Sequence, residues 1–137
     1  MIFPFRGLHK HHAEKEKSYK LTKTQAKFFW KRFSFWCCFW GCDKCWEIHP
    51  KEEVDDNCYA SVGVSAKDGM AVIRLVLTWD VPVTNKLIDK VAFHESVHLF
   101  LSQVTDYDDN DIAQEHAVVR VMENQVWKNL SEYAKGN

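Results

Sequence analysis

The chain has 137 residues, of which 46% are hydrophobic and 27% are charged, and its formal net charge is -1. This length and balance are typical of one globular domain with a single core of ordinary size. A near-neutral charge excludes a uniformly basic protein that binds nucleic acid through phosphate contacts alone. No run approaches the ~20 apolar residues that a membrane-spanning helix needs, and no apolar signal segment follows the first methionine. We therefore expect a cytoplasmic protein with no membrane partner.

Basic residues are concentrated at the start of the chain. Residues 1–35 hold nine Lys and Arg against two Glu, whereas residues 36–137 hold nine basic and seventeen acidic residues. Residues 8–20 are polar and show no clear apolar face. We expect residues 1–20 to form a mobile basic arm, followed by a single domain over residues 21–137. Binding of this arm to nucleic acid or to an acidic partner is the less favoured alternative.

An aromatic helix is predicted to follow the arm. Thr22 and Gln25 have the spacing of a capping box, apolar residues then recur every three or four positions as far as Trp40, and Gly41 is a natural helix stop. Phe and Trp lie on two faces of this helix, which predicts burial on two sides. Aromatic residues at helical spacing are usually core, so we favour a scaffold over a surface that stacks on single-stranded nucleic acid.

A cysteine pair with CxxC spacing, Cys42 and Cys45, follows this helix. A structural zinc site needs four ligands, and His49 and Cys58 are the downstream candidates for the other two. No second CxxC follows, and cysteine often behaves as a small buried hydrophobe. Packing is therefore favoured over a second metal ion at Cys42 and Cys45, and a redox role ranks last because no βαβ setting surrounds the pair. Five cysteines without a secretory signal favour reduced thiols.

Three short strands are predicted next. Residues 46–49 alternate in polarity and end at Pro50, which predicts a short edge strand. Residues 59–66 and 71–79 are rich in strand-forming residues, and the Lys-Asp-Gly at 67–69 between them is typical of a hairpin turn. These runs predict a three-stranded sheet.

Two helices complete the expected order of elements. Thr84 is a plausible N-cap for a helix that runs to about Val104, and a last helix is expected from about Asp111 to Tyr133. The order helix, three strands, helix, helix predicts an α+β domain rather than an alternating βα one. No pattern in the chain indicates its oligomeric state.

The segment His94-Glu95-Ser96-Val97-His98 has the HExxH pattern and lies inside the first of these two helices. Residues four apart are ~40° apart around a helix, so both imidazoles point to one side and can share a metal ion. Glu95 projects in a neighbouring direction, from which it can reach a water molecule on that metal. The alternative is a helix that carries two surface histidines and a glutamate with no metal.

The last helix supplies candidates for a third metal ligand. Glu115 falls in the middle of its apolar stripe, and a carboxylate that faces a core normally has a cation or a metal beside it. We therefore predict Glu115 as the third ligand, with a buried pair to Lys or Arg as the alternative. His116, at the edge of the stripe, is the second candidate for the ligand. Glu123, two turns beyond Glu115, is placed to orient a metal-bound histidine through its other ring nitrogen. The apolar stripe consists of Ile112, Val119, Met122, Val126 and Leu130.

HESVH followed by QEHAVV resembles the small gluzincin-type zinc metallopeptidases, and is also similar to short HExxH proteins encoded by bacteriophages. The resemblance covers roughly residues 59–123. It implies a minimal zincin-like fold in which a substrate chain pairs with the sheet edge beside the metal, and a location in the host cytoplasm if the chain is phage-encoded. No HExxHxxGxxH extension is present, which disfavours a metzincin.

These features together predict a zinc-dependent hydrolase of peptide or protein substrates. Zinc held by His94, His98 and Glu115 would activate a water molecule, and Glu95 would take its proton. Tyr107 and His116 are the candidates to steady the oxyanion. The alternatives are a non-catalytic binding protein on a zincin scaffold and a metal protein associated with nucleic acid.

Overall fold

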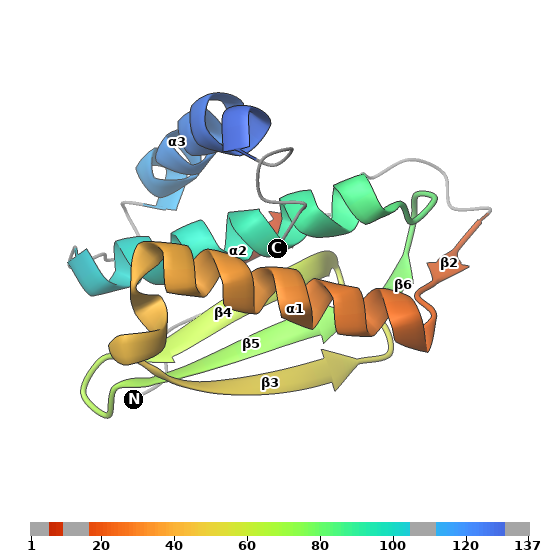
Figure 1. Cartoon of the computed structure of the whole chain (residues 1–137). Helices are drawn as coiled ribbons and strands as arrows, with labels where there is room; N and C mark the ends of the chain where they lie inside the picture. Colours follow the sequence, from red (N-terminus) through yellow and green to blue (C-terminus); the bar gives the residue numbers. More distant parts are fainter. Residues whose placement is uncertain (1–5, 10–16, 105–111, 131–137) are drawn as a thin grey trace.

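The computed structural model describes residues 6–9, 17–104 and 112–130, which form three helices and two small sheets (Figure 1). The fold is therefore α+β, as predicted. None of the described helices is long and apolar enough to cross a membrane. The helices are α1 (Lys23–Trp40), α2 (Asn85–Val104) and α3 (Ile112–Met122), with a short 3-10 turn η1 (Cys42–Lys44) and a π-helical turn η3 (Glu123–Trp127). The strands are β1 (Arg6–His9), β2 (Tyr19–Lys20), β3 (Glu47–Glu53), β4 (Cys58–Ser65), β5 (Met70–Val76) and β6 (Thr78–Trp79).

The main sheet has four strands in the order β1-β4-β5-β3 rather than the three predicted. Strands β4 and β5 form the expected antiparallel hairpin, while β3 runs parallel to β5 at one edge and β1 runs antiparallel to β4 at the other. The hairpin turns at Gly69, whose φ of 66° is a left-handed conformation that glycine adopts without strain. Strands β2 and β6 form a separate two-stranded sheet.

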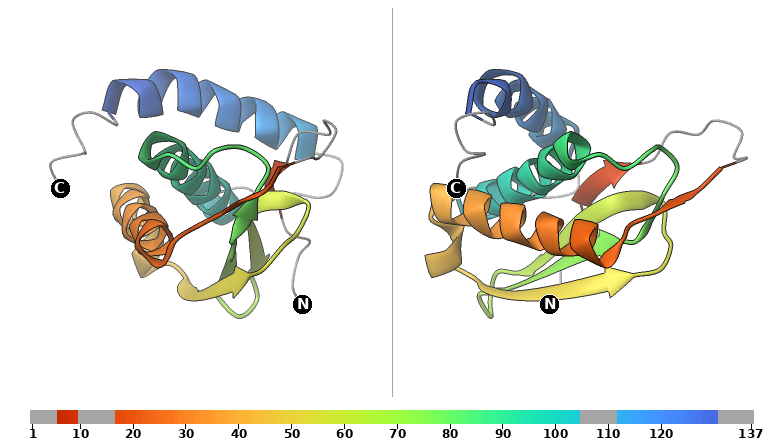
Figure 2. Two further views of the ribbon diagram at one scale, coloured as in Figure 1. Left: turned by 90° about the vertical axis from the view of Figure 1, so that its right-hand side faces the viewer. Right: turned by 45° about the vertical axis from the view of Figure 1, so that its right-hand side comes forward.

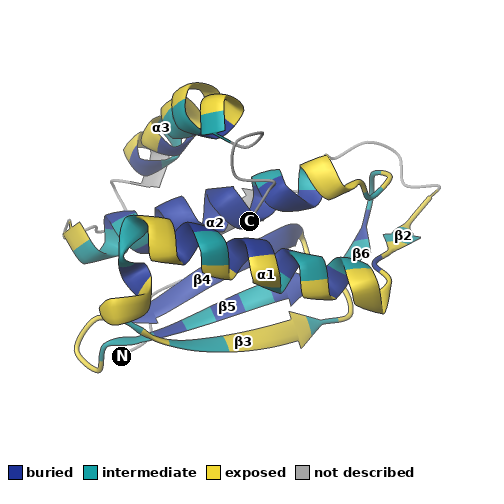
Figure 3. Ribbon diagram, viewed as in Figure 1, coloured by how far each residue is buried: buried dark blue, intermediate teal, exposed yellow. Residues whose placement is uncertain are grey.

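Helices α1 and α2 lie side by side on one face of the main sheet, and α3 lies over α2 on the side away from the sheet (Figures 1 and 2). Helix α2 is consequently covered on two sides, and most of its length is buried (Figure 3). The apolar core between these layers includes Trp36, Trp79 and Phe93, none of which is exposed.

The ends of α1 are those that the sequence predicts. Thr22 accepts a hydrogen bond from the Gln25 backbone N–H at 3.0 Å, and the Gln25 side chain accepts one from the Thr22 N–H at 2.9 Å. Gly41 ends the helix with a φ of 79°, again in the left-handed region. Helix α2 begins after Thr84, whose hydroxyl accepts a hydrogen bond from the Leu87 N–H at 3.1 Å.

Two predictions about the strands need correction. Strand β3 does not end at Pro50 but continues to Glu53 along β5. Proline is tolerated there because β3 is an edge strand, where one side of the backbone has no partner strand. Parts of the predicted basic arm are also strands, since Arg6–His9 pairs with β4 and Tyr19–Lys20 pairs with β6. Most other residues of the predicted arm lie outside the described part of the chain.

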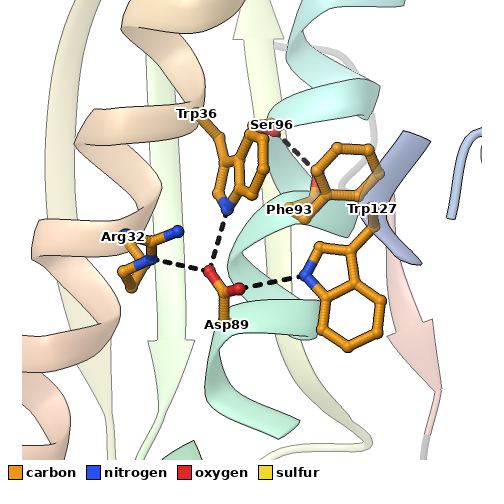
Figure 4. Close-up of polar contacts among 6 residues, drawn as sticks. All are labelled: Arg32, Trp36, Asp89, Phe93, Ser96 and Trp127. Atoms are coloured by element: carbon orange, nitrogen blue, oxygen red, sulfur yellow. Dashed lines mark hydrogen bonds and ion pairs between the residues drawn. The ribbon is translucent and has the colours of Figure 1, made fainter. Parts of the chain in front are cut away.

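A buried carboxylate, Asp89 of α2, joins three helical segments (Figure 4). Its Oδ1 accepts hydrogen bonds from Arg32 Nε at 2.8 Å and from Trp36 Nε1 at 2.9 Å, both on α1. Its Oδ2 accepts one from Trp127 Nε1 at 3.0 Å, in η3. Arg32 and Asp89 are only 4% and 6% exposed. Arg32 is therefore part of the interior and is not available to a nucleic-acid surface on α1.

The network around Asp89 predicts a large loss of stability in Asp89→Ala. The substitution leaves the Arg32 cation and two indole N–H groups without their acceptor inside the protein, which costs about 3–5 kcal/mol. Urea denaturation followed by circular dichroism measures the free energy of unfolding. Asp43→Ala, at an exposed position in η1, is the control and should change it by less than about 0.5 kcal/mol. Equal effects of the two substitutions would contradict this role of Asp89.

Candidate metal centre

The two histidines of the HExxH segment lie one turn apart on α2, on the side that faces α3. His94 is 4% exposed and His98 is fully buried. Their Nε2 atoms are 3.1 Å apart, and their ring centroids are 4.8 Å apart. The helical spacing thus brings the two imidazoles together as the sequence predicts.

Each of these imidazoles contacts a buried glutamate through its other nitrogen. His98 Nδ1 lies 2.5 Å from Glu115 Oε1, and His94 Nδ1 lies 3.1 Å from Glu123 Oε2. Both glutamates belong to the C-terminal helical segment, Glu115 in α3 and Glu123 at the start of η3. An ionised carboxylate only accepts hydrogen bonds, so a carboxylate in this position favours the tautomer in which Nδ1 carries the proton and Nε2 carries the lone pair.

His116 brings a third imidazole to this group. Its ring centroid is 5.1 Å from that of His98 and 6.3 Å from that of His94. The three side chains each offer one ligand atom, and these atoms lie within 4.8 Å of one another. His116 is half-buried, so it is the member of the group nearest to solvent. Among the described residues, these three histidines are the group whose spacing suits a shared metal ion.

The donor set fits a metal ion with nitrogen ligands. Two imidazole nitrogens bound at 2.0–2.1 Å to one tetrahedral zinc lie roughly 3.3 Å apart, close to the observed 3.1 Å. At this distance the two Nε2 atoms can share either a proton or a metal ion. A shared proton would use only two imidazoles, whereas the third imidazole and the two carboxylates behind the first pair match a metal centre.

The sequence predictions for this site have different outcomes. Glu115 is 1% exposed, which confirms the predicted burial, but its oxygen contacts His98 instead of standing in the ligand group. The ring nitrogen of His116, the second candidate, lies with those of His94 and His98, and the choice between Glu115 and His116 as a metal ligand stays a prediction. Glu123 makes the predicted contact with the far nitrogen of a histidine in the ligand group. Tyr107 lies outside the described residues, so its predicted role stays a prediction.

The π-helical turn η3 is a feature that the sequence does not reveal. At α-helical spacing Trp127 lies ~60° from Ile112 and outside the apolar stripe, on the same side as polar residues. A π turn holds more residues than an α turn, so it rotates the following side chains back. Trp127 is consequently buried and contacts Asp89 of α2, while Glu123, the first residue of the turn, is buried against His94.

Glu95, the predicted general base, is fully buried in α2. Burial raises the pKa of the Cys58 thiol on β4, and the negative charges of Glu95 and Asp56 raise it further, to about 11. Glu95 therefore lies close to the strand β4 as well as next in sequence to His94.

Comparisons of the chain with family models, with curated proteins and with solved structures found no match. The resemblance to gluzincins rests on the sequence motifs alone, and no relative's activity is carried to this chain.

The five cysteines are all free thiols. Cys37 and Cys42 are buried in the core, and a hydrogen bond with Cys42, followed by burial, raises the pKa of Cys37. Cys45 is exposed, and His49 Nε2 contacts Glu47 at 3.0 Å. Within the described ranges, no group of three ligand atoms forms around Cys42 and Cys45, so the geometry does not favour a second metal ion there.

Thiol labelling tests this distribution of cysteines. At pH 8, iodoacetamide should modify the exposed Cys38 and Cys45 within minutes, whereas Cys37, Cys42 and Cys58 should react only after unfolding in urea. A pKa of about 11 leaves about one Cys58 in a thousand as thiolate at pH 8. Peptide mapping by mass spectrometry identifies the modified residues. Rapid labelling of Cys58 in the native protein would contradict its burial.

Metal affinity distinguishes His116 from Glu115 as the third ligand. If three histidines hold the ion, His116→Ala should lose stoichiometric zinc, while Glu115→Gln and Glu123→Gln should retain it with affinity lowered about 10–100-fold. Competition with a chromophoric chelator measures these affinities, and Gln114→Ala, an exposed neighbour on α3, is the control. Loss of zinc in Glu115→Gln but not in His116→Ala would instead support the ligand that the sequence predicts.

Proposed function

We propose that the protein is a zinc-dependent peptide hydrolase. The observation that carries the proposal is the pair of Nε2 atoms 3.1 Å apart, each belonging to an imidazole whose Nδ1 contacts a buried carboxylate. The HExxH segment then places Glu95 beside this pair on the same helix. The order of elements, with α1 and a mixed sheet before α2, supports a zincin-like arrangement.

His94, His98 and His116 would hold the ion. Imidazole nitrogens suit zinc, and three protein ligands leave a fourth position open, as in catalytic zinc sites. Bound zinc supplies a Lewis acid that polarises a peptide carbonyl and lowers the pKa of a coordinated water.

Glu115 and Glu123 act on the imidazoles rather than on the substrate. By accepting from Nδ1 of His98 and His94, they fix the tautomer in which Nε2 carries the lone pair. They also hold the rings in one orientation, because both glutamates come from one helical segment packed over α2. The carboxylates therefore keep two ligand atoms aimed at the same point.

Glu95 is the residue that moves protons in this proposal. Its carboxylate accepts a proton from the attacking water and delivers it to the amine that leaves when the peptide bond breaks. Glu95 is fully buried in α2 and is next in sequence to His94.

A second candidate function is a metal-binding protein without turnover. The observation that favours it is again Glu95, which has no exposed surface. A residue that must meet a substrate peptide has to become accessible at some stage. A protein that remained closed would bind the metal and cleave nothing.

The variant Glu95→Gln separates the two candidates. It keeps the volume of the side chain and removes the base, so zinc content should be unchanged while kcat for peptide cleavage falls at least about 100-fold. Cleavage is measured by mass spectrometry on a mixed peptide library, with Glu52→Gln on the exposed edge of β3 as the control. Full activity in Glu95→Gln would exclude Glu95 as the base, and zinc-loaded wild type without any cleavage would favour the second candidate.

A further inference from the structure

Helix α1 presents to solvent a ridge of side chains at intervals of four residues. Its members are Lys23, Lys27, Lys31, Phe35 and Phe39. Residues four apart lie ~40° apart around a helix and about 6 Å apart along its axis, so these five side chains follow one line about 24 Å long. The three lysines are exposed, and exposed segments lie along the outer side of α1 (Figure 3). We call this line of side chains the α1 ridge.

The charge around the α1 ridge has one sign. Residues 17–42 contain six Lys and Arg and no Asp or Glu, whereas residues 43–137 contain nine basic and seventeen acidic residues. The carboxylates of Asp89 and Glu52 contact α1 through Arg32 and Trp30, and neither pairs with a lysine of the ridge. In the part of the chain that the structure describes, every ion pair uses Arg or His as the cation. The ammonium groups of the ridge are therefore available to an external anion.

This arrangement of lysines does not favour the stability of α1 itself. Like charges four residues apart on a helix repel each other, and Lys23, in the first turn, opposes the helix dipole. The surfaces of globular proteins usually intersperse the two signs of charge. A partner with closely spaced negative charges would remove the repulsion along the ridge.

The other end of the α1 ridge offers aromatic rings. Phe39 is 49% exposed, although Phe29 and Trp36 of the same helix are fully buried. The ring of Phe39 is held edge-on by Trp36 and Trp40, with centroids 5.7 and 4.9 Å away and interplanar angles of 81°. Phe35, one turn earlier, is half-buried. Phe39 is thus a fixed ring with about half of its surface open to solvent.

A single strand of nucleic acid matches both parts of the ridge. Its phosphates carry regularly spaced negative charge for the lysines, and its unpaired bases can stack on an exposed aromatic ring. The bases of a duplex are already stacked on one another, and an acidic peptide has no flat ring at each charged position. An anionic membrane would require apolar side chains along the whole face, whereas here they occupy only the last two positions.

We infer that the α1 ridge is a binding site for single-stranded nucleic acid. The inference goes beyond the proposed function, because it concerns an outer surface and requires no bound metal ion. It leaves the inner faces of α1 as scaffold, since Phe29 and Trp36 remain in the core.

The expected salt dependence follows from the number of lysines. Lys20, which is exposed just before α1, adds a fourth cation to the three of the ridge. Each phosphate contact on a single strand contributes about -0.7 to the slope of log K against log salt, so four contacts give a slope of about -3. Raising the salt concentration from 50 to 200 mM should then weaken binding about 50-fold.

The first experiment measures binding of a fluorescein-labelled strand of twelve thymidines to the full chain by fluorescence anisotropy. The double variant Lys27→Gln with Lys31→Gln should bind about tenfold or more weakly than the wild type at 50 mM salt, with a slope reduced to about -1.4. The matched control is Lys67→Gln with Lys128→Gln, which removes the same charge from exposed positions outside α1. Its affinity should stay within about twofold of the wild type, because distant charges are screened by salt.

The second experiment tests the aromatic end of the ridge with Phe39→Leu. Leucine keeps an apolar side chain but has no ring on which a base can stack, so the affinity for the thymidine strand should fall about fivefold or more while the salt slope stays unchanged. Val121→Ala, at an exposed apolar position of α3, is the control and should bind as the wild type does. The same strand annealed to its complement should bind more weakly than the single strand.

Three results would overturn the inference. The first is equal affinity of the Lys27→Gln, Lys31→Gln variant and its lysine control for the thymidine strand. The second is unchanged affinity of Phe39→Leu together with equal binding of single strand and duplex. The third is binding of the wild type to poly-glutamate or to phosphatidylserine vesicles but not to the thymidine strand. None of these readouts depends on zinc or on turnover, so they are separate from the test of the hydrolase.

Discussion

One buried carboxylate sets the relative positions of all three helices. Asp89 accepts from Arg32 and Trp36 of α1 and from Trp127 of η3 while it belongs to α2 itself. Its Arg32 partner neutralises its charge, and the two indole donors bring the hydrogen bonds that it accepts to three, which favours the tolerance of a buried ion pair. The carboxylates that contact His94 and His98 arrive on the same helical segment as Trp127. The geometry of the candidate metal centre therefore depends on an anchor that belongs to the scaffold.

Helix α2 carries an unusual number of polar groups into the interior. Asp89, His94, Glu95, Ser96 and His98 are all buried, because the sheet and α1 cover one side of the helix and α3 covers the other. Burying such groups costs free energy unless they are paired. Asp89 pairs with Arg32, and His94 and His98 each contact a glutamate of the last helical segment. The aromatic helix α1 contributes the apolar surface that offsets this cost, with Phe29 and Trp36 fully buried. The cysteine-rich and tryptophan-rich half of the chain thus supports the half that carries the chemistry.

Local and periodic features of this fold could be predicted from the sequence. The caps of α1, the β4–β5 hairpin, the α2 helix and the burial of Glu115 all follow from residue types and spacing within a few turns of chain. Features that depend on contacts between distant segments could not. The pairing of β1 with β4, the Arg32–Asp89 ion pair and the continuation of β3 through Pro50 each need the arrangement of neighbouring elements. The choice between Glu115 and His116 is of the same kind, because both lie on the inner side of α3 and only its docking on α2 decides which atom faces which imidazole.

The π turn at Glu123–Trp127 divides the last helical segment into two parts with different phases. Glu115 before the turn and Glu123 at its start contact the histidines, and Trp127 at its end contacts Asp89. A straight α-helix of this sequence would satisfy one of these contacts at the expense of the other. The wider turn changes the direction of the side chains that follow it, so one short helical segment can contact both His94 and Asp89 of α2. Changes in chain length within this turn would uncouple the metal centre from its anchor while leaving each local structure intact.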